Sequence, residues 1–238
     1  MSSSSGSLLT RPTNRQLLLP YAAPYLAYVG IASIPNEILP MEANYALRII
    51  TVSLLLFWAW RWYCPLKGPL SALGSILVGS GVGFLGLLLW LAFLFPFVTS
   101  GDGQPWSTSS FLLRLLSAGL LVPLFEELIM RGFLLRLALQ WDYARKNKEE
   151  EPFFIALDER SVNDVLPGKW SWAAILLSTL AFVSGHAMHE WLAAAVFGLL
   201  MAWLWVSRKD LLSCITAHAV TNIALAFFVY FTGNWQFW

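Results

Sequence analysis

Long apolar stretches alternate along this chain with short polar segments. Seven of them approach the roughly 20 residues that a helix needs to cross the ~30 Å hydrocarbon core of a bilayer. These runs are Leu17–Ile34, Tyr45–Cys64, Leu73–Val98, Phe111–Gln140, Trp172–Met188, Trp191–Val206 and Leu211–Phe231. The pattern predicts an all-α, polytopic membrane helix bundle with seven transmembrane helices, or eight if the third or the last run breaks.

Composition agrees with a membrane protein. Hydrophobic residues make up 58% of the 238 positions and charged residues only 12%, whereas a soluble domain carries about 25% charged residues. Much of the surface is therefore expected to face lipid. The net charge of +1 is not the basic excess of a nucleic-acid-binding protein, so the expected partner is the lipid bilayer and no nucleic acid.

Basic residues predict the orientation of the helices. Lys and Arg occur before the first run and in every second connection after it, and they are absent from the other connections and from the tail. By the positive-inside rule, this predicts a cytoplasmic N-terminus, an outside C-terminus and a location in the cell membrane. We divide the chain into a polar cytoplasmic N-terminus (1–16) and a single bundle (17–238). Its cytoplasmic loop (141–169) is interpreted as a solvated connection, with a substrate-docking or regulatory role as the alternative.

A glycine-rich stretch in the third run has a structural interpretation. Gly81-Val-Gly-Phe-Leu-Gly86 matches the letters of a dinucleotide-binding loop, but no strand precedes it and no acidic residue follows about 20 positions later. Gly79 and Gly83 instead form a small-residue face, which allows a neighbouring helix to approach closely.

Polar residues inside three of the runs are the candidate chemistry. An ionisable group at the centre of a bilayer costs at least ~2.5–3.5 kcal/mol on insertion scales, so it is retained where a partner or a function requires it. Counted from the cytoplasmic helix ends at 1.5 Å per residue, these groups lie within about one and a half helical turns of each other. They can therefore meet in a central polar cavity. The residues are Glu126, Glu127, Arg131, Phe182-x-x-x-His186, His218 and Asn222.

Helical spacing suggests a role for each group. Glu127 and Arg131 share a helix face and can pair, which leaves Glu126, rotated by about 100°, free to act as a general base on water. His186 would orient that water or shuttle its proton. His218 and Asn222 share another face and can donate hydrogen bonds to the oxyanion of a peptide carbonyl. The region 123–222 thus predicts a hydrolase that cleaves a peptide or protein substrate near the membrane.

Other functions use the same residues. No cofactor is expected for the water-activating mechanism, but Glu126, His186 and His218 together make a hydrolytic zinc set, so a zinc-dependent intramembrane metalloprotease is the alternative. A non-catalytic scaffold or immunity protein is a further alternative, as is a transporter with a proton relay. His189 and Glu190 follow His186 in the order H-x-x-H-E, which is not the H-E-x-x-H order of zincins, and we expect them to have a structural role in an outer turn.

In these three motifs the sequence resembles the CPBP family, the CAAX prenyl endopeptidases of the Ras-converting type and their bacterial and archaeal relatives. The motifs are Glu126-Glu127-x-x-x-Arg131, Phe182-x-x-x-His186 and His218-x-x-x-Asn222, in this order. The resemblance implies an all-helical intramembrane CAAX protease, usually of eight helices, in which Glu126 and His186 activate water. It also implies that His218 and Asn222 form the oxyanion site, with Glu127, Arg131 and Phe182 in support.

The resemblance leaves the substrate open. Prenylated tails are the substrates of eukaryotic members, whereas bacterial relatives are linked to bacteriocin immunity, peptide maturation or surface-protein processing. The compact chain with its polar N-terminus favours a bacterial or archaeal type.

Overall fold

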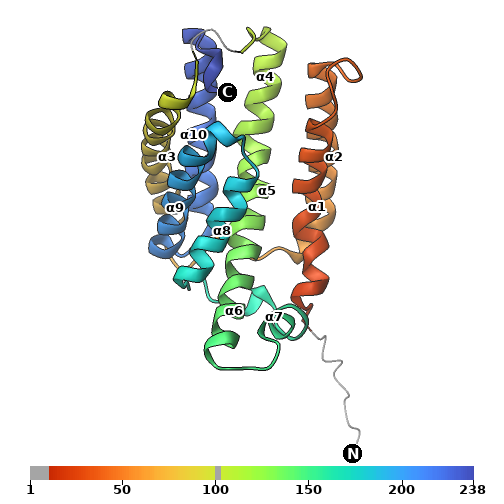
Figure 1. Cartoon of the computed structure of the whole chain (residues 1–238), viewed down its shortest axis with the longest axis vertical. Helices are drawn as coiled ribbons and strands as arrows, with labels where there is room; N and C mark the ends of the chain where they lie inside the picture. The colour runs from red at the N-terminus through yellow and green to blue at the C-terminus, as the bar shows by residue number, and fades with distance from the viewer. Residues whose placement is uncertain (1–10, 100–102) are drawn as a thin grey trace, which may run out of the picture.

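The fold is an elongated bundle of helices that run mostly along one axis (Figure 1). The computed structural model describes residues 11–99 and 103–238, and within these ranges it contains helices and no strand. The predicted all-α class is therefore confirmed for the described residues. Most of the predicted polar N-terminus, residues 1–10, lies outside the described part. The first helix, α1 (Asn14–Ala32), begins at a capping box formed by Thr13 and Gln16, which satisfies N–H groups that the first helical turn leaves free.

Each predicted apolar run coincides with a helical segment. Four segments are long and apolar enough to cross a membrane, and only 28–44% of each apolar window is buried inside the protein. Much of their apolar surface therefore points outward, as contact with lipid requires. The segments besides α1 and the long central helix are α2 (Met41–Ala59) with η1 (Trp60–Trp62), α3 (Ala72–Leu94) with η2 (Phe95–Phe97), α8 (Trp172–Ser184), η7 (Met188–Glu190) with α9 (Trp191–Arg208), and α10 (Leu211–Thr232) with η8 (Trp235–Phe237).

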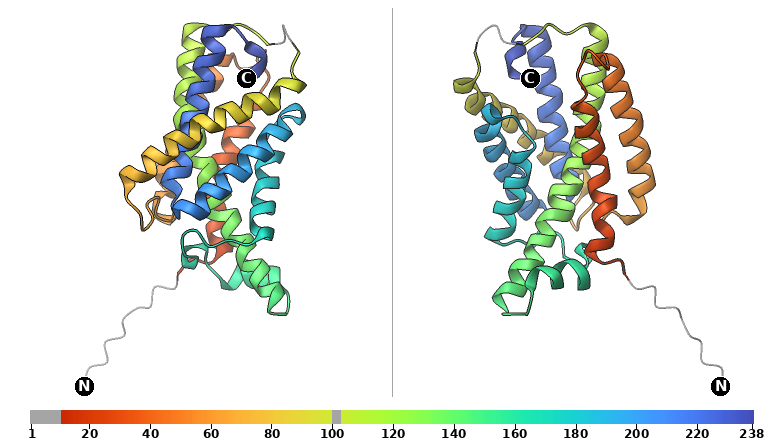
Figure 2. Two further views of the ribbon diagram at one scale, coloured as in Figure 1. Left: turned by 90° about the vertical axis from the view of Figure 1, so that its left-hand side faces the viewer. Right: turned by 45° about the vertical axis from the view of Figure 1, so that its right-hand side comes forward.

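The fourth run forms one continuous helical rod at the centre of the bundle, drawn in green in Figure 2. Three α-helical stretches alternate in it with two π-helical turns. In order, they are α4 (Thr108–Leu116), η3 (Ser117–Leu121), α5 (Val122–Glu127), η4 (Leu128–Leu134) and α6 (Leu135–Lys146). The rod ends at Lys146 and not at the predicted Gln140, because the polar last turns are stabilised by ion pairs from Arg145 and Lys146 to Asp142.

Proline has a different consequence in each of two helices. In the central rod, Pro123 has no N–H to donate, and its ring would clash with the Gly119 carbonyl, four residues earlier, in a regular α-helix. The π-helical turn η3, which contains Gly119, lies just before the proline. In α1, Pro24 likewise leaves the carbonyl of Pro20 without a helical partner, and the hydroxyl of Tyr63 donates to that carbonyl at 3.0 Å. Such replacement bonds are what allow a proline within a membrane helix.

The remaining helices stand on two sides of the central rod. The α1–α2 pair lies on one side, and α3, α8, α9 and α10 lie on the other (Figures 1 and 2). Helices α3 and α10 pack closely. A Cβ atom on Gly79 would lie 2.7 Å from the carbonyl oxygen of Ser213, and one on Gly83 would lie 2.6 Å from that of Ala217. The predicted small-residue face is therefore confirmed.

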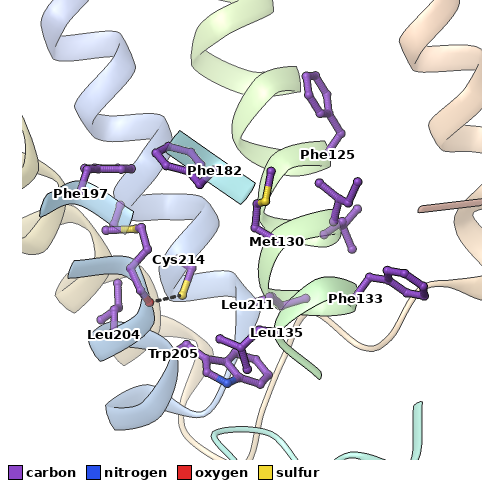
Figure 3. Close-up of a cluster of buried hydrophobic side chains, with 14 of the residues drawn as sticks. Phe125, Met130, Phe133, Leu135, Phe182, Phe197, Leu204, Trp205, Leu211 and Cys214 are labelled. Atoms are coloured by element: carbon purple, nitrogen blue, oxygen red, sulfur yellow. Dashed lines mark hydrogen bonds between the residues drawn. The ribbon is translucent and has the colours of Figure 1, made fainter. Parts of the chain in front are cut away.

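A hydrophobic core fills the space between the helices along the bundle and includes Met130, Phe133 and Trp205 (Figure 3). One end of the bundle carries the connection of residues 147–169 (Figure 1). The connection itself contains α7 (Pro152–Phe154), η5 (Ile155–Glu159) and η6 (Val162–Asp164).

The connection packs against the start of α1, while most of its residues stay exposed or partly exposed. The Asn14 amide donates to Gln140 Oε1 at 2.6 Å and to the Ala156 carbonyl at 2.7 Å, and its oxygen accepts the Val162 N–H at 2.5 Å. These three bonds tie α1, α6 and the connection together. Each of the three partners lies more than 100 positions from Asn14 in the chain. A local sequence pattern therefore does not reveal these bonds.

Candidate active site

One pocket of about 210 Å³ brings together residues from the three sequence motifs. Glu126 reaches it from α5, His186 from the turn after α8, and His218 and Asn222 from α10. Since a water molecule takes up about 30 Å³ in the liquid, the pocket has room for water and for a short piece of substrate. Phe182 also lines the pocket, whereas Glu127 and Arg131 lie behind its wall.

Behind the wall, Glu127 forms the predicted ion pair with Arg131, at 3.2 Å between Arg131 Nη1 and Glu127 Oε1. Both side chains are at most 1% exposed. Arg131 also donates to the Gly198 carbonyl at 3.0 Å, which links the central rod to α9. The pairing satisfies two buried charges that would each be costly alone.

The same carboxylate orients His218. Its Nδ1 lies 3.0 Å from Glu127 Oε1, and because an ionised carboxylate only accepts hydrogen bonds, Nδ1 carries the proton. The other ring nitrogen, Nε2, then faces Glu126, at 3.8 Å from its Oε2. This distance is longer than a hydrogen bond. Glu126 is 14% exposed, so its carboxylate has access to the pocket.

His186 also uses Nδ1 for a hydrogen bond, but its partner is a backbone carbonyl. Its Nδ1 lies 2.9 Å from the carbonyl oxygen of Phe182, which can only accept, so Nδ1 is the protonated nitrogen and Nε2 keeps its lone pair. The sequence places His186 inside the run Trp172–Met188, but α8 ends at Ser184. The reason is local: the Phe182 carbonyl at the helix end accepts from the Gly185 N–H and from the imidazole, which satisfies an otherwise free group.

Pro123 explains how Asn222 is held. The Val122 N–H bonds to the Ser117 carbonyl, and the next N–H in that π pattern would come from residue 123, which is proline. The Ala118 carbonyl is thereby left free, and Asn222 donates one amide N–H to it at 2.8 Å. An asparagine amide has two N–H groups, so the second remains for a ligand in the pocket.

Phe182 is the packing centre of the site. Its ring lies 4.5 Å from the His186 ring and 6.0 Å from the His218 ring, centroid to centroid, and the Arg131 guanidinium lies 5.4 Å above it. Phe182 is 1% exposed. It therefore restricts the orientation of both imidazoles, in agreement with a supporting position.

Several pocket residues carry no signal in the sequence. Tyrosines and tryptophans within apolar helices look like core residues, although the Trp90 indole nitrogen is buried without a hydrogen-bond partner among the described residues. Glu190 was expected only in an outer turn; it accepts the Ala187 N–H at 2.9 Å and borders the pocket. The additional lining residues are Tyr28, Tyr45, Trp90, Ala118, Val122, Glu190, Phe197, Thr221, Leu225, Phe237 and Trp238.

The zinc alternative has no matching ligand set in this geometry. Within residues 11–99 and 103–238, no group of three or more His, Cys, Asp or Glu side chains is placed to hold a metal ion. Glu126, His186 and His218 share the pocket, with Glu126 Oε2 at 3.8 Å from His218 Nε2.

Comparison with known proteins gives one match. A family model described as type II CAAX prenyl endopeptidase Rce1-like matches residues 108–224. The match begins at the start of the central rod and ends just after Asn222, so it contains every predicted site residue. No curated protein sequence and no solved structure matches the chain.

Proposed function

Because the chain belongs to the CAAX protease family of Rce1-like type II prenyl endopeptidases, we propose that it is an intramembrane endopeptidase that cleaves peptide bonds with activated water. The observation that carries the proposal is the shared pocket of Glu126, His186, His218 and Asn222. Within it, both imidazoles present Nε2: that of His186 is suited to accept from water, and that of His218, in the doubly protonated ring, is suited to donate to an oxyanion.

The first half of the reaction creates the nucleophile. His186 Nε2 accepts a hydrogen bond from water, and Glu126 takes the other proton as the water oxygen attacks the carbonyl carbon of the substrate. General base assistance of this kind contributes typically 10²–10⁴ in rate. Glu126 then delivers the proton to the leaving amine as the C–N bond breaks, which returns the carboxylate to its starting state.

The second part of the proposal concerns the negative charge on the carbonyl oxygen. The free N–H of Asn222 and the Nε2–H of His218 donate to it. His218 already donates from Nδ1 to Glu127, so it acts as an imidazolium. The charges of Glu126, Glu127, Arg131 and His218 then sum to zero, which lowers the free-energy cost of burying this protonation state.

The short length of α8 supports a site within the membrane. Its 13 residues span about 20 Å, less than the ~30 Å hydrocarbon core. If α8 begins at the cytoplasmic surface, the turn with His186 lies below the opposite surface. We propose that the seven helical segments are embedded in the cell membrane with the N-terminus in the cytoplasm, which accords with the alternation of basic residues.

A pair of glutamate variants tests the proposal. Glu126→Gln removes the general base, and Glu190→Gln is the matched control because it changes another carboxylate that borders the same pocket. We expect comparative proteomics of membrane peptides to show cleavage products in cells with wild-type protein and with Glu190→Gln, and their loss with Glu126→Gln. An unchanged peptide pattern with Glu126→Gln would show that the protein is not this protease.

A further inference from the structure

The segment of residues 234–238 forms part of the pocket wall. It turns back from the end of α10 (Figure 2) and contains η8. Phe237 and Trp238 line the same space as Glu126, and Phe237 is only 6% exposed. The segment lies beyond residue 224, where the family match ends. A segment in this position controls how a ligand enters the pocket.

Within the described residues, no hydrogen bond joins this segment to the bundle beyond the end of α10. Its N–H groups bond internally, from Phe237 to the Asn234 carbonyl at 3.2 Å and from Trp238 to the Trp235 carbonyl at 3.3 Å. The Asn234 amide reaches back only to Thr232, the last residue of α10. The described ion pairs do not include the segment either. It can therefore leave the bundle without breaking such a bond.

Aromatic packing holds the segment in place. The Phe237 ring stacks on Phe95 at 6.4 Å between centroids and meets Phe228 at 5.9 Å, and the Trp238 ring lies 5.1 Å from that of Trp106. Apolar contacts are non-directional, so they permit other positions. Tryptophan side chains are also stable at the membrane–water interface. The segment thus has a second favourable environment close to the one that it occupies.

Gly233 provides a hinge between α10 and the segment. It ends the helix with φ +69° and ψ 16°, in the left-handed region, which glycine adopts at no steric cost. A Cβ atom there would meet only Trp235 Nε1, at 3.9 Å. The backbone conformation therefore favours glycine, and the available space does not require it. This turn directs the chain back over the pocket.

We propose that residues 234–238 form a lid that opens at Gly233 to admit a ligand to the pocket. In the closed state, Phe237 and Trp238 stand in the way of entry, and in the open state their rings lie at the membrane–water interface. The inference goes beyond the proposed protease function, because a lid controls the entry of any ligand. The fraction of open molecules then scales the apparent affinity for that ligand.

A cysteine in the pocket reports the opening. The full chain is placed in liposomes in a Cys64→Ala/Cys214→Ala background, and Val122→Cys adds a thiol to the pocket lining. Mass spectrometry follows its modification by methyl methanethiosulfonate. We expect Gly233→Ala to speed this modification at least about threefold, because alanine strains the closed state at a positive φ and not the open state.

Gly233→Asn is the matched control. Asparagine adopts the left-handed conformation more readily than alanine and also occurs at this position of helix ends, so its modification rate should stay within about twofold of the parent rate. Equal rates for Gly233→Ala and the parent would overturn the lid. A thiol that stays unmodified in every form would overturn it as well, since an opening lid must admit the reagent.

A reversible crosslink provides the second measurement. In the same background without the reporter, a short bis-thiosulfonate linker joins Phe95→Cys to Phe237→Cys and fixes the segment against η2. We expect cleavage of a degenerate peptide library to fall at least about tenfold and to recover when a reductant removes the linker. Phe95→Cys alone, treated identically, is the control. Unchanged cleavage after complete crosslinking would show that the segment is a fixed wall.

The two measurements separate the lid from the proposed function. If no form of the protein cuts any peptide, the protease proposal fails, and the modification rates of Val122→Cys still decide the lid. If peptides are cut at a rate that neither Gly233→Ala nor the crosslink changes, the lid is overturned and the protease stands.

Discussion

At the scale of single residues, the site depends on which nitrogen of each histidine is occupied. His186 uses Nδ1 on a backbone carbonyl, and His218 uses Nδ1 on the Glu127 carboxylate. Both rings therefore present Nε2 to the pocket, and of the two only His218 lies within 4 Å of a carboxylate oxygen among the described residues. The two imidazoles therefore have different surroundings, although in the sequence both are simply histidine.

The Glu127–Arg131 pair allows stability to be separated from activity. Arg131→Met leaves Glu127 buried without its cation, and we expect a loss of about 3–5 kcal/mol in the free energy of unfolding. The Glu127→Gln/Arg131→Met double variant should regain most of that stability, because no lone charge remains. Its activity should stay lower than wild type by about 10²-fold or more, since the His218 imidazolium loses its counter-charge.

Unfolding in a denaturing detergent and peptide cleavage measure the two properties. Recovery of both stability and activity in the double variant would mean that the pair only supports the fold.

At the scale of elements, close contact between α3 and α10 sets the position of the site. Helix α10 supplies both His218 and Asn222, and it approaches α3 where glycines leave room for backbone atoms. The Thr221 hydroxyl adds a hydrogen bond to the Gly83 carbonyl at 2.7 Å. A change in this contact should therefore affect both stability and catalysis.

Two glycines of α3 make a matched test. In Gly83→Ala, the new methyl group would lie 2.6 Å from the Ala217 carbonyl, whereas Gly81→Ala meets nothing within 4 Å. We expect Gly83→Ala to lower the free energy of unfolding by about 1–3 kcal/mol and to reduce activity by displacing α10. Gly81→Ala should change neither in thermal unfolding and cleavage assays; equal effects of the two variants would contradict this account.

Asp142, near the end of α6, predicts an effect of pH on the stability of the fold. Hydrogen bonds from Lys146 first and Arg145 next lower the pKa of Asp142 from 3.8 to about 2, although burial opposes the shift. A carboxyl group whose pKa is lowered on folding stabilises the protein above its unfolded pKa, and this contribution is lost as the pH falls through the folded value.

The Asp142→Asn variant checks the sign. It should be less stable than wild type at pH 7, and the difference in thermal stability should shrink below about pH 4 and vanish near pH 2. Lys146→Met should reproduce part of the loss at neutral pH. A stability difference that stays constant from pH 7 to pH 2 would show that the Asp142 charge is not the cause.

At the scale of the whole molecule, the hydrophobic core extends along the bundle, whereas the pocket lies toward one end of it. The core includes the pocket-lining residues Phe182 and Phe197 as well as Trp205 (Figure 3), while the pocket is bordered by Glu190 and the C-terminal Trp238. Substrate access is therefore expected from the end opposite the charged connection, which the positive-inside rule assigns to the outside.

Topology can be measured directly. Seven spans place the chain ends on opposite sides of the membrane, whereas eight spans place them on the same side. In a Cys64→Ala/Cys214→Ala background, we expect an impermeant maleimide to label Asn234→Cys on intact cells. It should label Asn147→Cys only after the cells are permeabilised. Labelling of neither position on intact cells would contradict the seven-span topology.

The sequence by itself determined the features that depend on neighbours along the chain. Apolar runs specify helices, and the four-residue spacing of Glu127 and Arg131 specifies their pair, because both follow from helical periodicity. Gly79 and Gly83 indicate a close helix contact for the same reason. The polar residues inside apolar runs also indicated four residues of the pocket, Glu126, His186, His218 and Asn222, since polar groups are costly in lipid.

Only the tertiary structure decided which helix faces meet. The bonds from His218 to Glu127 and from Asn222 to Ala118 join segments about 100 residues apart, and they depend on how the helices rotate and pack. The same holds for the tyrosines that line the pocket. A one-dimensional pattern does not contain those rotations, because they arise from side-chain packing across the whole bundle.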